Sequence, residues 1–128
     1  MKLEAQSDIV LNRMEGVLMA SINVALTSTV LAGFREDVFH RLTVERSPVL
    51  VLDLSGASLM DVEEFESLRM LAQSVAIMGT ETWFVGLRPE VAATLVTLGA
   101  RTGGLRTALD LDTVLKRVRH QKQGAGHA

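Results

Sequence analysis

The sequence contains no cysteine and no tyrosine, and four phenylalanines and one tryptophan supply all of its large aromatic rings. Without cysteine the chain can form neither a disulfide framework nor a CxxC metal or redox site, and it suits a reducing cytosol. A nucleic-acid surface needs a broad basic face interleaved with stacking rings, whereas this chain has few rings and a formal net charge of −2. We therefore expect no nucleic-acid partner.

Long apolar runs are also missing. No stretch reaches the length of a membrane span, and the first residues, which include Glu4 and Asp8, lack the basic-then-apolar order of a signal peptide. The composition, with 48% hydrophobic and 22% charged residues, is that of an ordinary globular domain. We expect a cytoplasmic protein with no membrane partner.

The chain has 128 residues, which is enough for one core. We expect a single domain over residues 1–122 and a flexible tail over residues 123–128, which are rich in small side chains. The basic excess lies near this end, at Lys116, Arg117, Arg119, His120 and Lys122. Cations at the end of a last helix are favoured by the helix dipole; the alternative is that they meet an acidic partner or a membrane surface.

The stretch from Val49 to Leu54 is the one around which the rest of the chain is organised. Its apolar run has no polar alternation, which predicts a strand in the middle of a sheet, buried on both faces. A loop of small residues from Ser55 to Ser58 follows, so it should lie outside the carboxyl end of a central strand, where α/β proteins usually carry function. The alternative is that this loop only turns the chain.

The flanking sequence predicts further strands and helices. Apolar runs at 9–14 and 17–22, joined by Glu15-Gly16, predict a hairpin, and an amphipathic helix follows from Thr27 or Ser28. Asp61 and Glu64 form a capping-box pair that opens a second helix. The remaining predicted elements are a strand at 82–85, a helix from Pro89, a weak strand near 105–106 and a last helix capped by Asp110. This order predicts an α/β fold: a mixed sheet opened by a hairpin, with helices packed mainly on one face.

One acidic residue invites a catalytic interpretation. Asp53 ends the central strand, as phosphate-accepting aspartates do, but a receiver-type Mg²⁺ site needs further acidic residues where this chain has Asn12-Arg13-Met14. Ser55 replaces the second carboxylate of an Asp-x-Asp motif. We therefore interpret Asp53 as a carboxylate that bonds loop amides.

Other catalytic motifs are missing. His40, His120 and His127 are scattered along the chain, so their spacing predicts no metal site. No P-loop, GxGxxG or GxSxG motif occurs either. We predict no catalytic residue, no metal and no cofactor, which favours a binding protein.

Several stretches together are similar to a known family. They are VLVLDLSG at 49–56, MGTETWFVGLRPEVAATLVTLG at 78–99, TALDLDTVL at 107–115 and the Met60-Asp61 pair that opens a helix. From Ile9 to Val118 the chain resembles the STAS domain of anti-sigma factor antagonists, in particular the small stressosome subunits (RsbS type) and the C-terminal half of their larger partners. The resemblance implies a STAS-type fold and a non-enzymatic bacterial partner switch. The implied partners are a serine/threonine kinase of the anti-sigma or switch type and STAS-domain paralogues, assembled into a large scaffold that holds the kinase until stress releases it.

One position departs from the family pattern. Family members usually carry the phosphorylated Ser or Thr directly after the acidic residue that opens the second helix, and that position is Val62, which cannot accept a phosphate. Either the protein is an unphosphorylated structural variant, or the hydroxyl has moved along the same loop, with Ser58 preferred over Ser55. Thr94 matches a second phosphorylated threonine of some larger subunits. The expected partner-binding residues are Ser55, Gly56, Ser58, Asp61 and Val62.

Overall fold

The computed structural model describes residues 9–57 and 60–126. In chain order its elements are β1 (Leu11–Met14), β2 (Val17–Ser21), α1 (Ser28–Val44), β3 (Val49–Asp53), α2 (Val62–Ile77), β4 (Glu81–Val85), α3 (Pro89–Thr97), β5 (Arg106–Ala108) and α4 (Leu111–Gly126). This is the predicted order, and the weak strand is present as β5. The α/β fold class is confirmed.

The strands form a mixed sheet in the order β1-β2-β3-β4-β5. β1 pairs with β2 antiparallel, and the pairs from β2 to β5 are all parallel. β3 lies at the centre of this sheet, and its first four residues are buried. The prediction of an interior strand from an unbroken apolar run is therefore confirmed.

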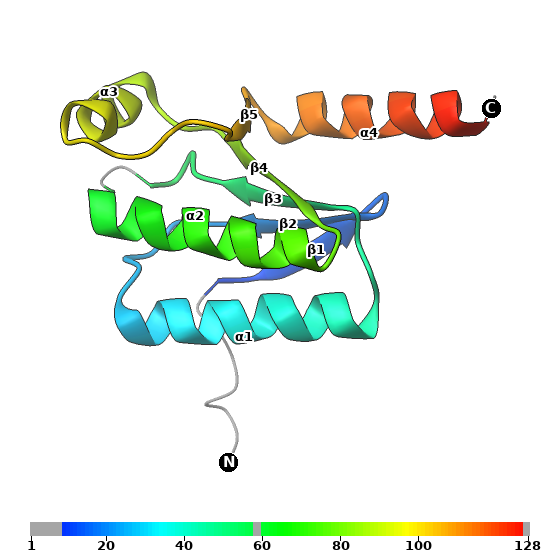
Figure 1. Ribbon diagram of the computed structural model, residues 1–128, viewed down its shortest axis with the longest axis horizontal. Coiled ribbons are helices and arrows are strands. Elements are labelled where there is room, and N and C mark those ends of the chain that lie inside the picture. Colours follow the sequence, from blue (N-terminus) through cyan, green and yellow to red (C-terminus); the bar gives the residue numbers. More distant parts are fainter. Residues whose placement is uncertain (1–8, 58–59, 127–128) are drawn as a thin grey trace, which may run out of the picture.

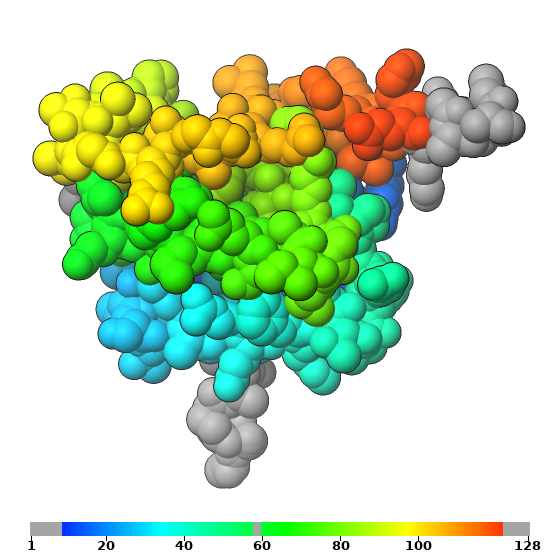
Figure 2. Space-filling view, in the orientation of Figure 1, coloured from blue at the N-terminus to red at the C-terminus, as the bar shows by residue number. Residues whose placement is uncertain are grey.

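Separate cores lie on the two faces of the sheet. Alternate side chains of β3 divide between them: Leu50 and Leu52 belong to one core, and Val49 and Val51 to the other. α1 and α2 lie side by side on the first face (Figure 1, Figure 2). α4 lies across the second face, where it buries Val114 (Figure 1).

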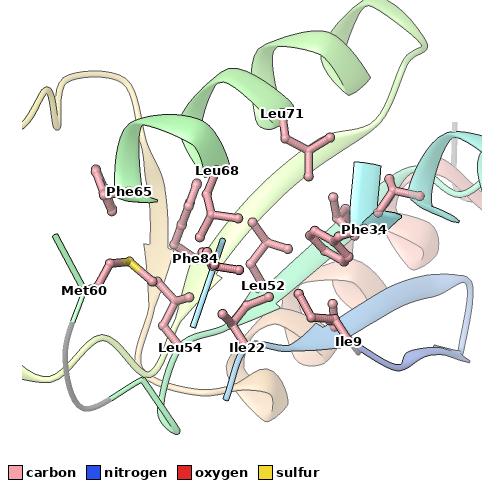
Figure 3. Packing of buried hydrophobic residues seen from close by; sticks show 14 of the residues in the cluster. Ile9, Ile22, Phe34, Leu52, Leu54, Met60, Phe65, Leu68, Leu71 and Phe84 are labelled. Carbon is pink, nitrogen blue, oxygen red and sulfur yellow. The ribbon is translucent and has the colours of Figure 1, made fainter. Parts of the chain in front are cut away.

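The larger core fixes the point at which α2 begins. Phe65 and Leu68 of α2 point toward the sheet in the close-up view (Figure 3), and the rings of Phe65 and Phe84 lie 5.8 Å apart. Met60, two residues before the start of α2, is 8% exposed and points into the same core beside Leu54 (Figure 3). Because full burial of such side chains stabilises by roughly 1.5–3 kcal/mol each, packing holds the start of α2 against the sheet.

The hairpin forms where Glu15-Gly16 predicts it. Glu15 and Gly16 both have positive φ, 52° and 82°, which suits a two-residue turn between twisted strands. Arg119 of α4 donates a hydrogen bond to Glu15 Oε1 over 2.8 Å. The turn is thereby joined to the helix that covers the second face.

The last helix is capped as the sequence predicts. Asp110 Oδ1 accepts hydrogen bonds from Thr113 N–H, over 2.9 Å, and from the Thr113 hydroxyl, over 2.8 Å. The bond from the backbone N–H has the larger effect and the bond from the hydroxyl adds to it, and both lower the pKa of Asp110 below its ordinary value. The helical backbone continues to Gly126, past residue 122, where the sequence places the end of the domain.

Candidate functional site: three interlocked loops

Three loops leave the sheet at the same edge, because β2, β3 and β4 are parallel and their ends are in register. Ser21 pairs with Asp53, and Asp53 pairs with Val85. The three connections are the β2–α1 loop (22–27), the β3–α2 loop (54–61) and the β4–α3 loop (86–88). The residues expected to bind a partner lie in or next to the middle loop, at the edge where open α/β sheets usually carry their function.

Asp53 orders the start of the β3–α2 loop. Its Oδ1 accepts a hydrogen bond from Ser55 N–H over 2.9 Å, which confirms its interpretation as a carboxylate that bonds loop amides. Ala57 N–H closes the turn by donating to Leu54 O over 3.0 Å. Ser55 and Gly56 form this turn and are exposed. A serine side chain is thus presented to solvent on an ordered turn.

Two glycines let the three loops touch. A Cβ on Gly56 would lie 3.0 Å from Asn23 Cβ, and a Cβ on Gly86 would lie 2.9 Å from both Asp53 Oδ1 and Ser55 Cβ. Gly86 also has a φ of +73°, which residues with a side chain rarely adopt. The turn at Ser55 and Gly56 is therefore held between the two neighbouring loops at a distance that leaves no room for a side chain on Gly56 or Gly86.

Glu64 links the start of α2 to the β2–α1 loop. Asp61 Oδ1 accepts from Glu64 N–H over 2.7 Å, and Glu64 Oε1 accepts from Asp61 N–H over 3.0 Å, so the predicted capping box is present. The other oxygen of this carboxylate, Oε2, accepts from Leu26 N–H over 2.9 Å. Sequence reasoning missed this second bond, because a capping-box motif specifies only the local partner.

Arg88 is a second residue that sequence reasoning missed. It is exposed and precedes α3, and its Nη2 donates to Ser55 O over 3.3 Å. Within the described residues no carboxylate forms an ion pair with Arg88. The signal that could have identified it is its place two residues after Gly86. The loop that holds Arg88 follows β4, which is parallel to β3, and the loop that holds Ser55 follows β3.

The other predicted residues have different surroundings. Asp61 is exposed, and Val62 is half-buried and packs against the larger core. Thr94 is exposed on α3, and its hydroxyl donates to Glu90 O over 2.9 Å, one turn earlier. Ser58, the preferred acceptor, lies outside the described residues.

An acidic groove of about 750 Å³ adjoins the loops, between the starts of α1 and α2 and residues 99–101, which follow α3. Leu26, Leu31 and Val62 give it apolar walls, and Glu63 and Glu66 line it with charge. A hydrogen bond from Arg69 holds the pKa of Glu66 below its ordinary value, so this carboxylate stays ionised. The edge therefore offers solvent-facing polar groups on a rigid frame, an arrangement suited to binding another protein.

Within residues 9–57 and 60–126, no three His, Asp or Glu side chains lie close enough to hold a metal ion. In the same part of the chain, no helix combines the length and the apolar character needed to cross a membrane.

The fold and its loop edge define a class of domain: the chain belongs to the STAS domain family, which it matches over residues 8–112. It is 28% identical to the RsbT co-antagonist protein RsbRC of Bacillus subtilis (strain 168) over 131 residues, covering 92% of this chain and 46% of RsbRC. The chain thus spans about half the length of this relative.

Two solved structures share the fold. A variant of RsbS from Moorella thermoacetica has a TM-score of 0.77 at 23% identity, and the match covers 91% of this chain and 99% of that one. A chain from a structure of the stressosome, described as a signal integration and transduction hub, has a TM-score of 0.73 at 22% identity, covering 88% of this chain and 98% of that one. At these identities the likeness establishes the fold.

Proposed function

We propose that this chain is a non-enzymatic regulatory component of a stressosome-type partner switch in the bacterial cytoplasm. It binds and sequesters a serine/threonine kinase of the anti-sigma or switch type, and it assembles with STAS-domain paralogues into a large oligomer. Phosphorylation of the β3–α2 loop releases the kinase. The observation that carries this proposal is the STAS match together with a relative named for co-antagonism of RsbT.

The geometry of the loop edge is compatible with a protein partner. The proposed contact surface is the β3–α2 loop with Ser55, Gly56 and Ser58, continued by Asp61 and Val62 at the start of α2. The close approach of Gly56 and Gly86 to the neighbouring loops, and the hydrogen bond from Leu26 N–H to Glu64, hold the described part of this surface. Little conformational entropy is therefore lost when a partner binds.

A phosphate on this loop would oppose a protein contact. It adds about −1.5 to −2 charges next to Asp61 and Glu63, and a desolvated interface disfavours such unpaired charge although the helix dipole offsets part of it. The proposed acceptor is Ser58, with Ser55 second and Thr94 third. A loss of a few kcal/mol at an interface changes its dissociation constant by orders of magnitude, since about 1.4 kcal/mol corresponds to tenfold.

A purely structural scaffold subunit without its own phospho-switch is the second candidate. The observation that favours it is Val62, which occupies the position where the family pattern expects the acceptor and which is half-buried against the core. A valine there can pack at an interface, and it accepts no phosphate.

Binding and assembly can be tested with the switch-type kinase and the STAS paralogues encoded in the same genome. Glu63→Lys reverses an exposed charge beside the proposed surface, and Lys116→Glu reverses an exposed charge on α4 as the matched control. We expect Glu63→Lys to weaken kinase binding at least tenfold by calorimetry and Lys116→Glu to change it less than twofold. A chain that stays monomeric at tens of micromolar and binds neither kinase nor paralogue would contradict the proposal.

The switch itself needs a separate experiment. Ser58→Asp should weaken kinase binding, and Ser58→Ala should bind normally and resist release, because only the first variant adds charge to the interface. Mass spectrometry after incubation with kinase and ATP then separates the alternatives. Phosphate on Ser58 or Ser55 supports the relocated switch, phosphate only on Thr94 places the switch on α3, and no phosphate favours the structural scaffold.

A further inference from the structure

Ser55 lies where two loops meet. Its N–H is bonded to Asp53 Oδ1 over 2.9 Å, its carbonyl accepts from Arg88 Nη2 over 3.3 Å, and its Cβ lies 2.9 Å from the position that a Cβ on Gly86 would occupy. The two hydrogen bonds hold the serine backbone between Asp53 and the β4–α3 loop. The Ser55 side chain therefore begins beside the β4–α3 loop, and the residue is exposed to solvent.

Arg88 has unused hydrogen-bonding capacity at this point. A guanidinium carries five N–H donors, and the hydrogen bond to Ser55 O uses only one of them. None of the carboxylates within residues 9–57 and 60–121 forms an ion pair with it. An arginine with free donors is the side chain best suited to hold a phosphate in a bidentate manner.

We propose that Arg88 binds the phosphate of a phosphorylated Ser55 through hydrogen bonds. Arg88 thereby couples the state of the β3–α2 loop to α3. In the transfer, the Ser55 hydroxyl loses its proton to the kinase's base, Oγ forms a bond to the γ-phosphorus of ATP, and ADP leaves. This inference rests on the proposed function, with its second-ranked acceptor, Ser55, as the modified residue, and it adds the residue that senses the modification.

The modification would rearrange the loop through two opposite forces. The new dianion attracts Arg88, which then exchanges its bond to the neutral Ser55 carbonyl for stronger, charge-assisted bonds to phosphate. The same dianion repels Asp53, whose carboxylate holds the Ser55 amide, so the turn at Ser55 and Gly56 is weakened. Because Arg88 is the residue before α3, the pull on its side chain also acts on the start of that helix.

The test uses the full chain with phosphoserine incorporated genetically at position 55 and needs no kinase. The second ionisation of the phosphate is followed by ³¹P NMR between pH 4 and pH 8, in the parent chain, in Arg88→Ala and in Arg88→Lys. Arg46→Ala is the matched control, because Arg46 is also exposed but precedes β3 and so lies at the opposite edge of the sheet. Circular dichroism checks that each variant is folded.

We expect a lower phosphate pKa in the parent than in Arg88→Ala, by about half a unit or more, since a neighbouring cation favours the dianion. Arg88→Lys should keep part of the shift because it keeps the charge, and Arg46→Ala should keep all of it. Equal midpoints in the parent and Arg88→Ala overturn the assignment, as does an equal effect of Arg46→Ala. The readout contains no partner, so a failure of kinase binding would remove the proposed function without changing this result.

Discussion

Replacing Glu64 by glutamine should remove one of the two backbone hydrogen bonds that its carboxylate accepts and leave the other in place. Oε1 accepts from Asp61 N–H over 3.0 Å, and Oε2 accepts from Leu26 N–H over 2.9 Å, so both oxygens face backbone donors. A glutamine side chain has one acceptor oxygen and one NH₂ group. Whichever way the amide is turned, one of the two backbone donors meets another donor and loses its partner.

The size of the effect follows from these contacts. A hydrogen bond to a charged group contributes about 1.5–3 kcal/mol, and we take the lower end because Glu64 is only half-buried. Glu64→Gln should therefore lower the free energy of unfolding by about 1–2 kcal/mol, and Glu64→Ala, which loses both bonds, by about 2–3 kcal/mol. The neighbouring Glu63→Gln should change it by less than ~0.5 kcal/mol, because within the described residues the Glu63 side chain makes no hydrogen bond or ion pair.

Urea unfolding at pH 7, followed by the fluorescence of Trp83, measures these differences. Trp83 is the single tryptophan and is 7% exposed, so its emission changes when the sheet unfolds. Hydrogen exchange adds a local readout: the Leu26 amide should lose protection in Glu64→Ala before the β3 amides do. If Glu64→Gln unfolds at the same urea concentration as Glu63→Gln, the link between α2 and the β2–α1 loop does not stabilise the domain.

Three further predictions concern other parts of the fold. Gly86→Ala should destabilise the domain by about 2–4 kcal/mol, because the new Cβ would meet Asp53 and Ser55 at a backbone φ of +73°. Gly33→Ala in α1, where nothing lies within 4 Å of the new Cβ, should stabilise the domain by up to ~1 kcal/mol. The midpoints of urea unfolding compare the two variants. Asp110 has a lowered pKa in the folded state, so its contribution is present above the ordinary aspartate pKa and is lost as the pH falls through the lowered value. On acidification from pH 5 to pH 2, the urea midpoint of the parent should therefore fall further than that of Asp110→Asn, and parallel curves would refute this. Val114→Ala, at a side chain 1% exposed under α4, should cost about 1–3 kcal/mol in thermal unfolding, and Val96→Ala, 61% exposed, should cost less than ~0.5 kcal/mol.

The local signals in the sequence predicted each element from residues close together in the chain. The run at Val49 predicted a strand buried on both faces, Asp61 with Glu64 predicted the start of α2, and Glu15-Gly16 predicted the hairpin turn. Their physical causes, which are burial, capping and positive φ, act over a few residues, so the sequence is sufficient to recognise them.

The contacts that make the loop edge one surface were decided only by the tertiary structure. Glu64 and Leu26 are 38 residues apart, and Arg88 and Ser55 are 33 residues apart. Nothing local distinguishes Glu64 from a capping glutamate that bonds one amide, or Arg88 from any exposed arginine. The sequence by itself determined that loops follow the central strands; the parallel register of β2, β3 and β4 brought those loops together, because it places the carboxyl ends of all three strands at one edge of the sheet.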